Sequence, residues 1–128
     1  PVVMSAGIAT LNLLKKNSVY DKLEKLGACL ETVFHELSNK VDIQVPRCGS
    51  MFGLFFSSKI INNWEGVLLS ELLYYKEFHH LMLKKGYYLP PSPYESFFIS
   101  VAHTKEDIIE FVHTACRIME FLYNKNKI

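Results

Sequence analysis

The strongest constraint on the fold is an apolar repeat in the first third of the chain. From residue 19 to about residue 40, apolar residues recur three or four positions apart. This spacing places them on one face of a helix, so we expect a helix over 19–40 that packs against a core. Ser18, followed by Asp21, predicts a box-type cap at its start. The apolar face consists of Leu23, Leu26, Leu30, Val33, Phe34 and Leu37.

The residues before this helix also have helical character. Pro1 suits a first helical turn because its missing N–H would have no partner there. Residues 1–16 carry apolar side chains on several sides, which predicts a helix buried on more than one side. The chain has 128 residues, enough for one domain, and it opens inside this pattern without an initiator methionine. We therefore expect residues 1–128 to be a single domain cut from a longer protein.

Shorter patterns follow in the middle of the chain. Residues 43–45 alternate as in a strand, and the apolar run from Met51 to Phe56 favours a strand buried on both faces. After a polar loop, apolar residues return at helical spacing over 66–85, and Gly86 fits the position just past a helix end. The stripe of this expected helix contains Leu68, Leu72, Tyr75, His79 and Met82.

A proline-rich turn separates two stretches of strand character. Residues 87–89 read as a strand, and the prolines of "PPSP" at 90–93 prevent regular pairing directly after it. From 97 to 102 the side chains alternate between two faces, as in a second strand. One face of that strand is expected to carry Phe97, Ile99 and Val101.

The last helix has a clear start. Thr104, with Asp107 three residues later, predicts its cap. The order of expected elements is helix, helix, strands, helix, strand, strand, helix. This order predicts the α+β class, with a small antiparallel or mixed sheet covered by helices. The apolar face of the last helix consists of Ile108, Phe111, Val112, Ala115, Met119 and Leu122.

Composition argues against several functions. The formal net charge is +1 and the lysines are dispersed, so no basic face for nucleic acid is expected. No apolar run approaches the roughly 18 residues of a membrane helix, so no membrane partner is expected either. The cysteines, Cys29, Cys48 and Cys116, are odd in number and form no close pair. They indicate a reduced, intracellular chain, and we expect a cytoplasmic location.

Several polar residues have a stronger structural than functional interpretation. His79 and His80 are neighbours on a helix and point about 100° apart, so they cannot share a metal, and no metal site is expected. Arg47 is either an anion-binding residue or, more commonly, a surface arginine. It could lower the pKa of Cys48, but a nucleophile also needs a positioned base. The glycines of "GSMFG" at 49–53 match no phosphate loop and favour a close approach of backbones.

Glu95 is the most distinctive polar residue. Three prolines at 90, 91 and 93 restrict the backbone before it, and Tyr94, Phe97 and Phe98 make its surroundings apolar. Two interpretations remain open for this carboxylate. It is a solvated acid in a turn, or it is partly desolvated, with a raised pKa, and hydrogen-bonds a polar ligand.

Three stretches together resemble one enzyme family. They are "PVVMSAGIATLNLL", "RCGSMFGLFF" and "GYYLPPSPYESFFISVAHTKEDI". In order and over essentially the whole chain, they look like the carboxy-terminal domain of the glutamate-1-semialdehyde 2,1-aminomutases. That family is a branch of the class III, fold type I pyridoxal-phosphate aminotransferases. The segments at 49–53 and at 89–104, including Glu95, carry the part of the resemblance that is specific to this branch.

The resemblance implies an activity and a site. Family members are homodimers that isomerise glutamate-1-semialdehyde to 5-aminolevulinate in tetrapyrrole biosynthesis, using pyridoxal phosphate. It implies that Glu95 is the catalytic acid of this chain, pointing into the active-site cleft, and that Ser92 and Ser50 lie near the substrate. The cofactor lysine and the other cofactor-binding residues belong to the large domain of the family and have no counterpart here. Residues 1–128 alone are therefore expected to be inactive.

Departures from the family pattern keep other interpretations open. Pro93 and Tyr94 stand where Gln and Phe are usual, and Ser96 replaces a common Ala, so the turn around Glu95 need not have the family's geometry. One alternative is a stand-alone, non-catalytic dimerisation or binding domain of the same fold. Another is a different class III aminotransferase that acts between two substrates.

Overall fold

A computed structural model describes residues 1–37 and 41–125, except for the side chains of Asn17 and Leu37. The expected end of the second helix at 38–40 and the expected packing of Leu37 therefore lie outside the described residues. The helices are α1 (Val2–Leu14), α2 (Asn17–Leu37), α3 (Trp64–Leu68), α4 (Leu72–Lys84) and α5 (Lys105–Lys125).

The strands are short and form two small antiparallel sheets. One sheet pairs β1 with β4, and the other has the order β2-β3-β5. The expected α+β class with an antiparallel sheet covered by helices is confirmed, with two sheets in place of one. The strands are β1 (Ile43–Gln44), β2 (Arg47–Cys48), β3 (Met51–Phe52), β4 (Phe55–Phe56) and β5 (Phe97–Phe98).

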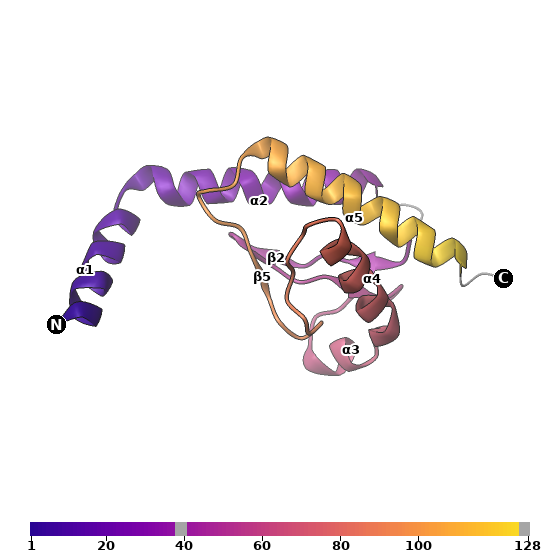
Figure 1. Cartoon of the computed structure of the whole chain (residues 1–128). Coiled ribbons are helices and arrows are strands. Elements are labelled where there is room, and N and C mark those ends of the chain that lie inside the picture. Colours follow the sequence, from indigo (N-terminus) through magenta and orange to yellow (C-terminus); the bar gives the residue numbers. More distant parts are fainter. Residues whose placement is uncertain (38–40, 126–128) are drawn as a thin grey trace.

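The core lies between the strands and the helices that cover them. Figure 1 shows α2 and α5 side by side above the strands, with α4 packed against α5 and α3 at the lower edge of the molecule. Phe34 of α2 meets Phe111 of α5 edge to face, with ring centroids 6.1 Å apart, and Phe52 stacks on Phe97 at 4.8 Å. The predicted apolar face of α5 is confirmed, since all six of its residues are buried.

The predicted cap of α5 is also confirmed. The Thr104 amide donates to Asp107 Oδ2 at 2.7 Å, and the Asp107 amide donates to Thr104 Oγ1 at 3.1 Å. Hydrogen bonds from the Thr104 amide and then from its hydroxyl lower the pKa of Asp107. Because the folded-state pKa is lowered, the stabilisation is present above the unfolded pKa of about 4 and is lost as pH falls through the folded pKa.

The expectation that residues 51–56 are buried on both faces is wrong. Burial alternates along this stretch: Phe52, Leu54 and Phe56 are buried, whereas Met51 is 41% exposed. Gly53 interrupts the run, and its amide donates to the Pro46 carbonyl at 2.9 Å. A Cβ on Gly53 would lie 2.6 Å from the ring of Phe55, so it is a side chain and not the expected backbone that approaches this glycine. The run is divided between two sheets, and only one of its faces contacts the core.

The single helix expected over 66–85 is two helices. Asn63 caps α3 by accepting from the Gly66 amide at 2.8 Å. The helix breaks at residues 69–71. The Ser70 amide and hydroxyl both donate to the Val67 carbonyl, and the Glu71 amide donates to the Phe56 carbonyl of β4. Of the predicted stripe, Tyr75 and Met82 are buried, whereas Leu68 and Leu72 are exposed. Gly86 follows α4 with φ +90°, as expected.

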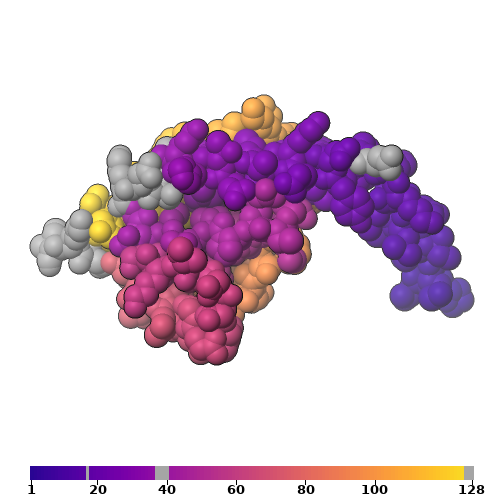
Figure 2. All heavy atoms as spheres, turned by 180° about the vertical axis from the view of Figure 1, so that it is seen from behind, coloured from indigo at the N-terminus to yellow at the C-terminus, as the bar shows by residue number. Residues whose placement is uncertain are grey.

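The expected burial of the first helix is wrong as well. α1 forms, but none of its residues is buried, and Val2 and Val3 are 82% and 83% exposed. Seen from behind, α1 extends away from the rest of the molecule (Figure 2). No other part of the described chain therefore buries the apolar side chains of α1. The expected cap at Ser18 is wrong for a local reason, since α2 already begins at Asn17.

Candidate functional site

The candidate site is the turn from Pro90 to Glu95. Its three prolines have no N–H, so the turn is closed by the few donors that remain. The Glu95 amide donates to the Ser92 carbonyl and the Tyr94 amide donates to Ser92 Oγ, both at 3.2 Å. The structure therefore places Ser92 and Glu95 in the same hydrogen-bonded turn.

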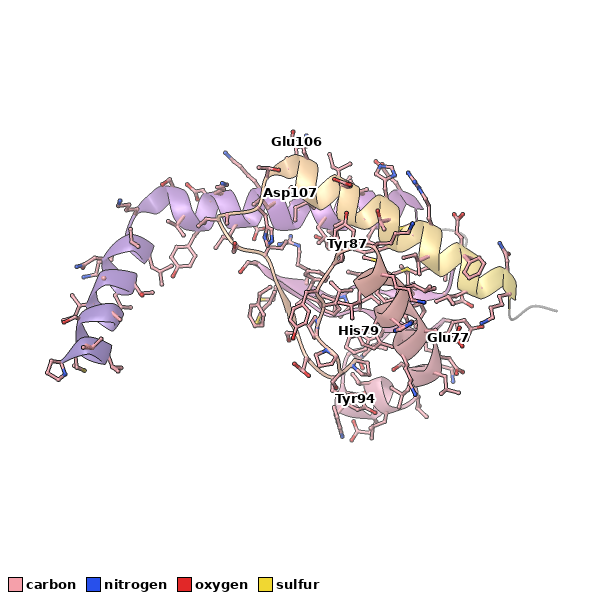
Figure 3. All side chains as sticks on the ribbon, in the orientation of Figure 1. Glu77, His79, Tyr87, Tyr94, Glu106 and Asp107 are labelled. Atoms are coloured by element: carbon pink, nitrogen blue, oxygen red, sulfur yellow. The ribbon has the colours of Figure 1, made fainter. Side chains whose placement is uncertain are left out.

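Helix α4 holds the start of the turn. Tyr75 is 2% exposed, and its hydroxyl donates to the Pro90 carbonyl at 2.6 Å. One turn further along α4, His79 Nε2 lies 3.2 Å from the Leu89 carbonyl and can donate to it when Nε2 carries the hydrogen. The rings of Tyr75 and His79 stack with centroids 6.4 Å apart. Figure 3 shows His79 on the side of α4 that faces this segment.

These contacts explain why the strand expected at 87–89 is wrong. The segment is extended, but it is not a strand of either sheet. The carbonyls of Leu89 and Pro90 accept from side chains of α4 in place of a neighbouring strand. The Tyr87 amide still belongs to the end of α4, since it donates to the Met82 carbonyl at 3.0 Å.

The end of the turn rests on α3. The rings of Tyr94 and Trp64 lie 5.2 Å apart, tilted by 53°. Tyr94 lies close to α3 at the lower edge of the molecule (Figure 3). Both rings remain about half exposed, at 44% for Tyr94 and 56% for Trp64. The turn is thus supported at its start by α4 and at its end by α3.

Glu95 itself is exposed, so of the two interpretations left open for its carboxylate, the solvated one fits this structure. Its negative charge nevertheless affects the pKa of Tyr75. Burial, and to a lesser extent the negative charge of Glu95, raise the pKa of Tyr75. The Tyr75 hydroxyl therefore stays protonated near neutral pH and remains a donor to Pro90.

A groove of about 500 Å³ lies between the two arms that lead into and out of the turn. Its walls are largely apolar and include Tyr88 and Phe98, both of which are strongly exposed. His103, just before α5, and Asp107, in its first turn, also belong to the lining. His103 Nδ1 accepts from the Ser100 amide at 3.0 Å and so helps to close the turn before α5. Val101, expected on the same strand face as Phe97, lies in this turn beyond the end of β5 and is 46% exposed.

Ser50, the third candidate, lies elsewhere. It occupies the turn between β2 and β3 beside Gly49, which has φ +60°. The Ser50 carbonyl accepts from the Ile99 amide at 2.9 Å, at the end of β5 that is remote from Glu95. Four residues of extended chain span about 13 Å. The structure therefore brings Ser92 and Glu95 together and leaves Ser50 at the opposite end of β5.

Arg47 is neither a free surface arginine nor an anion-binding residue. Its side chain is 12% exposed and is 3.0 Å from both Glu24 and Glu31 of α2. Its Nη1 also donates to the Gly49 carbonyl at 2.8 Å, which fixes the β2–β3 turn against α2. A Cβ on Gly27 would lie 2.5 Å from that carbonyl oxygen, so α2 needs glycine at this approach. With its charge compensated, Arg47 offers little to activate the exposed Cys48.

The sequence patterns did not identify Tyr75 and His79 as site residues. Both were assigned to an apolar helix stripe, and nothing in their spacing indicates hydrogen bonds to carbonyls 15 and 10 residues away. Within the described ranges 1–37 and 41–125, no group of three or more His, Cys, Asp or Glu side chains could hold a metal ion. Among the described helices, none has the length and apolar content needed to span a membrane.

Curated relatives of this chain share one name. Over 110 residues it is 44% identical to the glutamate-1-semialdehyde 2,1-aminomutase of Akkermansia muciniphila, a match of 84% of this chain. Over 131 residues it is 40% identical to the enzyme of the same name from Clostridium beijerinckii, a match of 99% of this chain. The chain is homologous to part of the glutamate-1-semialdehyde 2,1-aminomutases. It spans only 26% and 30% of the length of these two aminomutases. No family model matches the chain.

Solved structures give the same fold. An omega-transaminase from Sphaerobacter thermophilus superposes on 94% of this chain with a TM-score of 0.77 and 19% identity, using 28% of its own length. A transaminase with PLP bound superposes on 100% of this chain with a TM-score of 0.73 and 22% identity, using 29% of its own length. The aminomutase homologue thus has the fold of one part of the fold type I transaminases.

The residues around Glu95 do not form a complete site for pyridoxal phosphate. The groove beside the turn has no lysine and no arginine in its lining, so it provides neither a cofactor amine nor a cation for the phosphate. What this part of the aminomutase homologue can contribute is an exposed carboxylate on a supported turn. A cofactor opposite that carboxylate must be held by residues outside this groove.

Proposed function

We propose that residues 1–128 form the carboxy-terminal domain of a longer, pyridoxal-phosphate-dependent glutamate-1-semialdehyde 2,1-aminomutase. Such an enzyme isomerises glutamate-1-semialdehyde to 5-aminolevulinate in tetrapyrrole biosynthesis. One observation carries the proposal: relatives of that name match 84–99% of this chain at 36–44% identity, and the match covers only 25–30% of each relative. Bound pyridoxal phosphate would supply the electron sink for the transfer of the amino group.

In this proposal Glu95 is the catalytic acid that this domain presents to the cleft. An exposed carboxylate on a turn held by α3 and α4 suits the binding of a substrate amino group or the movement of a proton. Ser92 has its hydroxyl on the Tyr94 amide and its carbonyl on the Glu95 amide, so its role is to shape the turn as well as to contact substrate. Ser50 would contact substrate from the other end of β5.

The intact enzyme is proposed to be a cytoplasmic homodimer. The exposed apolar side chains of α1 support this proposal, because apolar patches of this kind are normally buried by another domain or subunit. The exposed cysteine, Cys48, is compatible with a reducing compartment.

A second candidate is a class III aminotransferase that acts between two substrates. It is favoured by the similarity of the fold to transaminases, with TM-scores up to 0.77. Those structures share only 19–22% identity with this chain, however, whereas the aminomutases share up to 44%. A stand-alone domain without catalysis is the third possibility, and it has no specific support in the fold.

A chimera tests the proposal directly. We expect the C. beijerinckii aminomutase, with its matching 131 residues replaced by this chain, to bind pyridoxal phosphate and to produce 5-aminolevulinate from glutamate-1-semialdehyde. The reason is that 40% identity over the whole domain preserves its fold and the presentation of Glu95. The same enzyme truncated before this domain is the inactive control. A folded chimera that binds the cofactor and only transfers amino groups between two substrates would favour the second candidate.

A further inference from the structure

The turn that carries Glu95 has few backbone donors of its own. Pro90, Pro91 and Pro93 contribute no N–H, so no regular ladder can join this segment to a neighbouring strand. For Pro90 the carbonyl is the only backbone group that can make a hydrogen bond, and the hydroxyl of Tyr75 occupies it at 2.6 Å. The pairing of β5 with β3 fixes the chain after Glu95, so the position of the segment before it depends on contacts made by side chains from elsewhere.

Tyr75 is well suited to make such a contact. It is 2% exposed and lies on α4 between Phe78 and Phe97, with ring centroids 6.3 Å and 6.5 Å away. A buried phenol needs a hydrogen-bond partner, and a distance of 2.6 Å is at the short end for O–H···O bonds. The ring is thus fixed by the core, and its hydroxyl extends that rigidity to the start of the turn.

We propose that Tyr75 is a positioning residue for Glu95: its hydroxyl, assisted by His79, fixes the Leu89–Pro90 segment and so determines where the carboxylate is presented. The functional consequence rests on the role proposed for Glu95 above. The assignment of Tyr75 and His79 rests only on the contacts described here. His79 supports the neighbouring carbonyl, which prevents the segment from rotating about a single hydrogen bond.

The chain contains two reporters of the position of this turn. Trp64 is the only tryptophan in the sequence, and it contacts Tyr94 directly before Glu95. The Glu95 amide donates to Ser92 inside the turn, so its hydrogen exchange reports local opening. Neither reporter requires catalysis. Failure of these measurements therefore contradicts the positioning role, whereas failure of the chimera contradicts the proposed function.

The test is Tyr75→Phe in the 128-residue chain, with exchange followed by NMR. We expect exchange of the Glu95 amide to become about five- to tenfold faster, because one hydrogen bond of the segment is lost. Acrylamide quenching of Trp64 should rise in parallel. Amides in the middle of α5, such as that of Val112, should keep their rates, which separates a local from a global effect. Tyr74→Phe is the matched control, since its ring packs on Phe56 at 5.8 Å.

A second pair of variants keeps the test valid if Tyr75→Phe does not fold. His79→Leu should speed exchange of the Glu95 amide, and His79→Gln, whose amide nitrogen can donate from nearly the same position, should restore the slow rate. Equal rates in the original chain, in His79→Leu and in Tyr75→Phe would overturn the proposal. A rise that is equally large for Val112 and Glu95 would also overturn it, because the residues would then support only the fold.

Discussion

Replacing Glu95 with glutamine is expected to lower kcat/KM of the chimeric aminomutase by about a hundredfold or more. Positioned acids and bases contribute factors of about 10² to 10⁴ to a rate. Glutamine keeps the size of the side chain and its ability to hydrogen-bond, but it has no negative charge and cannot accept a proton at neutral pH. The measurement is steady-state production of 5-aminolevulinate, with cofactor content determined by absorbance in the same samples.

The control for this variant is Glu110→Gln, which removes another exposed carboxylate, on α5. It should leave kcat/KM within a factor of two, because Glu110 is distant in sequence from the turn and faces solvent. If Glu95→Gln behaved like Glu110→Gln while the cofactor remained bound, Glu95 would be a solvated acid in a turn, and the proposed site would be wrong.

The second large effect concerns stability. Phe78→Ala is expected to lower the free energy of unfolding by about 4 kcal/mol, within the range of 3–5 kcal/mol found for buried phenylalanines. Phe78 is 0% exposed, and its ring lies 5.7 Å from that of Phe56 and 6.3 Å from that of Tyr75. Its removal leaves a cavity where α4 packs on β4. Urea denaturation followed by circular dichroism gives the value.

The chain offers a matched control in Phe121. This residue has the same side chain on α5 but is 59% exposed, so Phe121→Ala should cost less than about 1 kcal/mol. Equal losses for the two variants would mean that the core does not lie between α4, α5 and the strands as described. A loss for Phe78→Ala that also slows turnover in the chimera would further link the core to the turn through Tyr75.

The long amphipathic helices were predictable because their apolar spacing reports which face is buried. The α5 face and the described residues of the α2 face are buried or partly buried in the core, as this rule predicts. The Thr104–Asp107 cap was visible as two residues at fixed spacing. Spacing does not report what covers a face, so the apolar α1 was wrongly placed in the core. It also cannot show that Ser70 and Glu71 bond elsewhere and divide a helix that the pattern extends through them.

The candidate site was predictable only in part. The prolines and the acid are adjacent in sequence, so the turn and its link to Ser92 could be anticipated. The support from α4 could not, because it joins Tyr75 to a carbonyl 15 residues away and is visible only once the helix is folded. The separation of Ser50 from Glu95 has the same cause, since the pairing of β3 with β5 determines which ends of these strands meet.

The central claim is that these residues are one domain of a longer pyridoxal-phosphate enzyme, and the mass and amino-terminal sequence of the protein made by its source cell test it most directly. The account predicts a product more than three times as long as this chain, since the C. beijerinckii relative is matched over only 30% of its length. It also predicts that borohydride reduction attaches the cofactor to a lysine outside residues 1–128. A product that begins near Pro1 and gains no cofactor on borohydride reduction would contradict the account. Glu95 would then be a solvated acid in a turn.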